Sequence, residues 1–214
     1  MDFLNQEFYG NSILNWGIAL GILIVSFVLV KVLYWIFSNI IRRLTSKTKT
    51  NLDDVLIDKL EKPLTYLLLI LGYWISIHYL TFTQEIEDVL ENVAYFLLVL
   101  DLTAILSRIV DALISEVIMP ISEKSESSFD NQLIPVIQKG VRSIIWVLGI
   151  IIGLDNIGFD ITAMIAGLGI GGLALALAAQ DSVKNIFAGI MIFLDKPFKI
   201  KDRIKIDGHD GVVE

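Results

Sequence analysis

Long apolar blocks alternate with short polar stretches along most of the chain. Five blocks are long enough to cross a bilayer, since a hydrocarbon core of ~30 Å takes about 20 apolar residues as helix. They cover residues 13–36, 64–82, 92–110, 136–154 and 161–179. A one-sided apolar pattern at helical spacing follows, made of Val183, Ile186, Phe187, Ile190, Met191 and Leu194. We therefore predict an all-α membrane protein with five transmembrane helices per subunit and an interfacial amphipathic helix.

After Pro197 the pattern changes to a period of two, which predicts a half-buried strand. Phe198, Ile200, Asp202, Ile204 and Ile206 alternate with Lys199, Lys201, Arg203 and Lys205. The basic face either is solvated or contacts lipid phosphates. The pairs 207–208 and 210–211, both Asp-Gly, are predicted turns. Since a lone apolar strand is an aggregation hazard, we expect the sequence to continue past Glu214 into a cytoplasmic β-domain.

The pattern divides the chain into four parts. Residues 1–118 hold three spans with bulky surfaces suited to lipid contact, and residues 119–134 form a polar cytoplasmic linker. Residues 135–195 form a pore module of two spans and the amphipathic helix. Residues 196–214 begin the β-domain.

Composition agrees with a membrane protein and removes several function classes. The 214 residues are 55% hydrophobic, against roughly 45–50% in soluble domains, and contain no cysteine. Disulfides and thiolate metal sites are thereby excluded. His78 and His209 fall in different compartments and cannot share a metal. No nucleophile, base and oxyanion set converges, so we expect no enzyme, metal or cofactor.

Lysine and arginine positions predict the orientation. The segment before the first span and the loops 83–91 and 155–160 contain neither residue, whereas 41–63, 111–142 and the C-terminal end are basic. Five spans with the N-terminus outside and the C-terminus cytoplasmic place every basic loop inside. Lys31 and Arg108 then lie near cytoplasmic helix ends, where they can snorkel.

Two polar features inside the spans have competing interpretations. Asp101 and Arg108 share a face, and form either an ion or proton relay or a structural pairing in which Asp101 meets a hydroxyl or Arg108. We favour the structural pairing, since nothing else polar converges there. Gly167, Gly169 and Gly172 match G-x-G-x-x-G, but inside an uncharged apolar helix the pattern does not indicate a nucleotide site.

The fifth block is dominated by small residues, which let helix backbones approach closely in lipid. They are Ala163, Ala166, Gly167, Gly169, Gly171, Gly172, Ala174, Ala176, Ala178 and Ala179. Small residues on opposite flanks suit a ring of identical helices, although packing within one bundle is the alternative. Leu173 and Leu177 are four apart on one face and would form two apolar rings at the ring axis.

A polar break follows at Gln180-Asp181-Ser182, where we expect the spanning helix to end. Asp181 is a suitable N-cap for the amphipathic helix, and Lys196 suits its C-terminal end. Asn185, Ala188 and Gly189 lie off its apolar face, toward the pore mouth or a neighbouring helix.

Residues 160–214 resemble the mechanosensitive channel of small conductance family. The likeness rests on the Gly/Ala-patterned helix and on these residues: 174–180 (Ala-Leu-Ala-Leu-Ala-Ala-Gln), Ser182, Asn185, Ala188-Gly189, Pro197-Phe198 and the basic strand. It implies that Leu173 and Leu177 are the pore-sealing rings and that Gly189 is a hinge. It also implies helix packing through Ala166, Gly169, Ile170, Gly172, Ala174 and Ala176. Two departures are Ile170, where a small residue is usual, and Asp181, where a second hinge glycine is common.

The resemblance implies a homoheptamer in the bacterial cytoplasmic (inner) membrane that contacts lipid and is opened by membrane tension. It would pass ions and small solutes with weak selectivity, releasing them on osmotic downshock, and Gln180, Asp181 and Gly189 would form the gating break or hinge. The alternative is a structural or transport subunit whose fifth helix packs against a different membrane partner.

Overall fold

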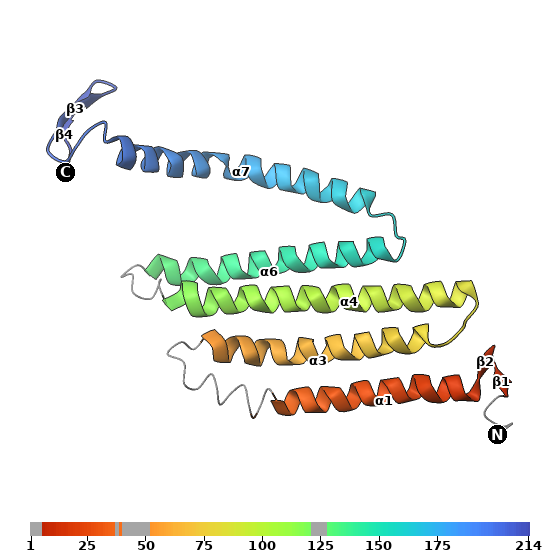
Figure 1. Cartoon of the computed structure of the whole chain (residues 1–214). Helices are drawn as coiled ribbons and strands as arrows, with labels where there is room; N and C mark the ends of the chain where they lie inside the picture. The colour runs from red at the N-terminus through yellow and green to blue at the C-terminus, as the bar shows by residue number, and fades with distance from the viewer. Residues whose placement is uncertain (1–5, 37–38, 40–51, 121–127) are drawn as a thin grey trace. The chain divides into compact units, whose positions relative to one another are not determined.

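The computed structural model describes residues 6–36, 39, 52–120 and 128–214 (Figure 1). These residues form two compact units, which divide between Ile161 and Thr162. Five helices are long and apolar enough to cross a membrane among the described residues. The mostly helical class with five spans is therefore confirmed.

The first unit is a row of antiparallel helices preceded by a small hairpin (Figure 1). Its elements are β1 (Glu7–Phe8), β2 (Asn11–Ser12), α1 (Ile13–Ile36), α3 (Leu52–His78), α4 (Gln84–Leu113), the π-helical turn η2 (Ile114–Ile118) and α6 (Ser128–Asn156). Helix α1 packs against α3, α3 against α4, and α4 against α6. We call the end with β1 and β2 the hairpin end, and the end where α3 begins the opposite end.

Close approach of small residues holds the row together. A Cβ on Gly72 of α3 would overlap the Ser26 side chain of α1, and Ser76 Oγ donates to the Ala19 carbonyl at 3.0 Å. A Cβ on Gly149 of α6 would overlap the Thr103 side chain of α4. These helices therefore pack through small residues and hydroxyls, as membrane helices do in the absence of a hydrophobic drive.

Helix α3 runs through Pro63, so the predicted start at residue 64 was wrong. A proline has no N–H and leaves the carbonyl four residues earlier without its helical partner. Here that carbonyl belongs to Lys59, and Arg108 Nη1 of α4 donates to it at 2.7 Å. A tertiary hydrogen bond thus replaces the helical hydrogen bond that Pro63 cannot donate. Helix α6 likewise contains Pro135 and begins within the segment predicted as linker.

Asn11 fixes the hairpin to the loop between α3 and α4. Its side chain is 1% exposed. Asn11 Nδ2 donates to the Thr81 carbonyl at 2.6 Å, while Oδ1 accepts from Thr81 N at 2.7 Å and Thr81 Oγ1 at 2.9 Å. Tyr9 and Gly10 have φ of 50° and 75°, the positive values that a tight hairpin turn requires.

Replacing Asn11 by alanine is expected to destabilise the first unit by about 1–3 kcal/mol, because the part-buried hydrogen bonds between the buried Asn11 side chain and the Thr81 backbone are lost. Thermal unfolding of the purified protein in detergent measures the change. Asn156→Ala is the matched control, since that exposed amide bonds only the Ile152 carbonyl of its own helix. Equal melting of both variants would contradict the anchoring role of Asn11.

The second unit consists of α7 (Thr162–Asp195) and a hairpin of β3 (Arg203–Ile206) and β4 (His209–Val212). Asp207 and Gly208 form the turn, with φ of 45° and 83°. The predicted turn at 210–211 was wrong, because both residues pair within β4 opposite Lys205 and Ile204. The strand is also shorter than predicted and begins at Arg203.

Candidate functional site

Helix α7 is the part of the chain richest in predicted site residues, and none of its residues is buried. A Cβ built on any of its glycines would meet nothing within 4 Å, in contrast to Gly72 and Gly149 of the first unit. The α7 glycines are Gly167, Gly169, Gly171, Gly172 and Gly189. The close approach that these residues permit is thus unused within the second unit.

At 3.6 residues per turn, the continuous helix assigns each predicted residue to a face. Leu173 and Leu177, each 62% exposed, share one face with Ala166 and Ile170. Gly169, Gly172 and Ala176 lie on one flank, Gly167, Ala174 and Ala178 lie on the other, and Leu168 and Leu175 lie behind. The arrangement gives a bulky apolar front between two small flanks, and puts Ile170 beside the leucines instead of on a flank.

The predicted helix break at Gln180-Asp181-Ser182 is not present, because α7 continues through it to Asp195. No proline or glycine lies at these positions, and Asp181 Oδ1 pairs with Lys184 Nζ at 3.3 Å, one turn on. Asp181 is therefore an interior residue and not an N-cap. The predicted amphipathic helix forms the second half of α7, with Gly189 inside it. Whether the helix bends there during gating stays a prediction.

Arg203 and Asp210 join the two strands of the C-terminal hairpin. Arg203 Nε and Nη2 donate to the two carboxylate oxygens at 3.0 and 2.9 Å. These hydrogen bonds raise the pKa of the Arg203 guanidinium above its usual value. One basic residue of the predicted strand face is therefore used for cross-strand pairing.

Neither interpretation of Asp101 and Arg108 is decided by a hydrogen bond between them. Arg108 donates to the Lys59 carbonyl, and the buried Asp101 Oδ2 has no hydrogen-bond partner among the described residues. At the hairpin end, His78 Nε2 lies 3.1 Å from Glu91 Oε1, and this contact joins α3 to α4. Within the part of the chain that the structure describes, no three acidic, histidine or cysteine side chains group as a metal site.

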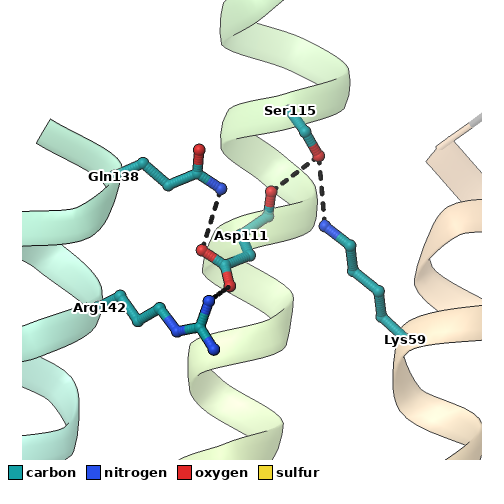
Figure 2. A network of polar contacts seen from close by, with 5 residues as sticks. All are labelled: Lys59, Asp111, Ser115, Gln138 and Arg142. Atoms are coloured by element: carbon teal, nitrogen blue, oxygen red, sulfur yellow. Dashed lines mark hydrogen bonds and ion pairs between the residues drawn. The ribbon is translucent and has the colours of Figure 1, made fainter. Parts of the chain in front are cut away.

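Asp111 is the centre of a polar network at the opposite end, which sequence reasoning missed (Figure 2). Its Oδ1 accepts from Gln138 Nε2 at 3.0 Å, and its Oδ2 lies 3.6 Å from Arg142 Nη1. Ser115 Oγ donates to the Asp111 carbonyl at 2.8 Å and accepts from Lys59 Nζ at 3.4 Å. The network therefore connects α3, α4 and α6.

Two family models match the C-terminal part of the chain. One, described as "Mechanosensitive ion channel, transmembrane helices 2/3", matches residues 139–180, which cover most of α6 and the first half of α7. The other, described as "Mechanosensitive ion channel, beta-domain", matches residues 181–214. The chain belongs to the mechanosensitive channel of small conductance family. Its members are channels and not enzymes, as predicted.

Similarity to members of this family extends over nearly the whole chain. The chain is 34% identical over 211 residues to the small-conductance mechanosensitive channel MscMJ of Methanocaldococcus jannaschii, covering 99% of this chain and 60% of the relative. It is 31% identical over 205 residues to that organism's large-conductance channel MscMJLR, covering 95% and 57%. It is 32% identical over 213 residues to the uncharacterized family protein YhdY of Bacillus subtilis, covering 100% and 57%.

The chain thus spans about 57–60% of the length of these relatives. No solved structure matches the chain significantly. The relatives are similar over residues 1–138 as well, so the N-terminal helices belong to the shared architecture of these proteins.

Proposed function

We propose that this chain forms the membrane part of a homoheptameric channel that opens under membrane tension. The observation that carries the proposal is the surface of α7: a bulky apolar front between two flanks of small residues whose glycines have open space around them. Such flanks suit two identical neighbours, one on each side, as a closed ring requires. Family membership supports the same arrangement.

In the closed ring, Leu173 and Leu177 face the axis and form an apolar constriction that blocks ions by dewetting. Ile170, on the same face, adds a third apolar ring one turn away. Gly169, Gly172 and Ala176 of one subunit meet Ala174 of the next. Ala166 lies on the same face as Leu173 and Leu177, so it contacts a neighbouring subunit only where the helices meet beside the ring axis.

Tension acts on the lipid-facing row of α1, α3 and α4, and opening widens the ring in the membrane plane. The open pore passes ions and small solutes with weak selectivity and releases them on osmotic downshock. The charge pattern supports an N-terminus outside and a C-terminus inside. The relatives from Methanocaldococcus jannaschii and Bacillus subtilis support a place in the cytoplasmic membrane of a prokaryote. The match of the second family model supports a cytoplasmic β-domain after α7.

The direct test is patch-clamp recording of the purified complete protein in liposomes under graded suction. A tension-gated channel gives stepwise currents. Its open probability rises with tension and falls back to the resting value when suction is released. A protein that reconstitutes as a ring and gives no tension-dependent current would contradict the proposal. Native mass spectrometry of the same preparation counts the subunits.

A further prediction concerns charge at Asp181, which is 91% exposed and pairs with Lys184. Asp181→Asn removes a ring of negative charge near the inner mouth and is expected to shift the reversal potential in a salt gradient toward anion preference. Lys184→Gln is the matched opposite change and is expected to shift it toward cations. If both variants keep the reversal potential of the unmodified protein, neither charge faces the permeation path.

A further inference from the structure

The Asp111 network crosses the boundary between the matched pore region and the helices before it. Arg142 lies within residues 139–180, which match the family's transmembrane helices 2/3, whereas Asp111, Ser115 and Lys59 precede that region. The side chains in Figure 2 converge on Asp111 from α6 on one side, and on Ser115 from α3 on the other. The network therefore links α6, the first helix of the proposed pore module, to the N-terminal helices α3 and α4.

Farther along the α4–α6 contact, two glycines of α6 form a close seam with Thr103 and Phe96 of α4. A Cβ on Gly149 would overlap Thr103, and one on Gly153 would lie 2.9 Å from ring carbons of Phe96. Apolar contact is non-directional, so such a seam resists separation of the helices but resists sliding along their axes less. Hydrogen bonds depend on distance and angle, so a polar contact at one end fixes the axial register.

Asp111 is well placed to hold that register. Its side chain is 13% exposed, and both carboxylate oxygens face α6 partners. Its own carbonyl accepts from Ser115, which lies in the π-helical turn η2 and binds Lys59 of α3. A π-helical turn departs from regular helix geometry and often occurs at functional positions. Three helices thus meet at one residue beside an irregular turn.

We infer that Asp111 couples the N-terminal helices to the pore module: it locks α4 to α6, so that tension collected by α1, α3 and α4 pulls on α6. The inference rests on the proposed function. When the contact is broken, α4 slides against α6 and part of the pull is lost. More tension is then needed to open the channel.

The absence of cysteine from the chain allows a clean test with introduced pairs. In the variant Asp111→Cys/Arg142→Cys, the thiols are left reduced or are joined by a short bifunctional thiol-reactive linker. At the unmodified protein's midpoint tension, the open-to-closed ratio of the reduced variant is expected to fall by about threefold to tenfold, because the Gln138 hydrogen bond and the Arg142 ion pair of Asp111 are both lost. Linking the thiols in the same patch is expected to restore the original midpoint.

The control is Glu116→Gln, which removes a carboxylate from the same turn outside the network and is expected to leave the midpoint unchanged. A reduced variant that gates like the unmodified protein, or one that the linker does not restore, would overturn the inference. Both outcomes leave the proposed function intact, because the unmodified protein still opens under tension. If the unmodified protein does not open, the proposed function itself fails.

Discussion

Channels carrying Leu173→Asp are expected to conduct without applied tension. An acid at this position places a ring of charges in the apolar constriction, which then holds water and no longer excludes ions. The effect is large because the barrier depends on the constriction staying dry. Recordings at zero suction measure the standing current, and slowed growth of expressing cells provides a second measure.

Leu173→Ile is the control, because it keeps the ring apolar and is expected to stay closed at rest. The alternative function, a subunit whose α7 packs against a different partner, predicts another result. There, the buried acid would prevent assembly and no current would appear. A folded, assembled Leu173→Asp protein that is silent at all tensions would rule out a constriction at this residue.

Alanine at Gly149 is expected to destabilise the protein by about 1–3 kcal/mol, the usual cost of overpacking a tight contact. The added Cβ overlaps Thr103, whose Oγ1 donates to the Val99 carbonyl at 2.7 Å and cannot turn away without losing that bond. Thermal unfolding in detergent, followed by the fraction of protein that remains monodisperse, measures the loss.

Gly140→Ala in the same helix provides a control of opposite sign. A Cβ there meets nothing within 4 Å, so the better helix propensity of alanine is expected to stabilise α6 by up to about 1 kcal/mol. Thr103→Gly combined with Gly149→Ala should recover part of the loss. Equal destabilisation by both single alanine variants would mean that the seam is looser than the structure has it.

Hydropathy predicted the number and order of the spans but misjudged where α3 and α6 begin. Pro63 and Pro135 indicate helix starts by local rules, and both lie inside helices. For Pro63 the reason is a residue 45 positions away, Arg108, which takes the free Lys59 carbonyl. Local sequence carries no sign of that bond.

The candidate site was readable in part, because helical spacing alone assigns Leu173 and Leu177 to one face. The glycines could not be sorted in the same way. Gly72 and Gly149 pack within the first unit, whereas Gly169 and Gly172 make no such contact within the second, and only the structure separates the two groups. The Asp111 network had one signal in the sequence: an acid among basic residues that the predicted topology places at the same end of the membrane.

The length of α7 has a consequence for how the bilayer acts on it. Its 34 residues make a rod about 51 Å long, whereas the hydrocarbon layer is about 30 Å thick. About 20 residues counted from Thr162 reach Asp181, so a straight rod would strand Phe187 and Phe193 in water. Hydrophobic mismatch is therefore expected to tilt α7 or to bend its second half into the interface, the two ways in which a stretch longer than the hydrocarbon layer is accommodated without thickening the bilayer.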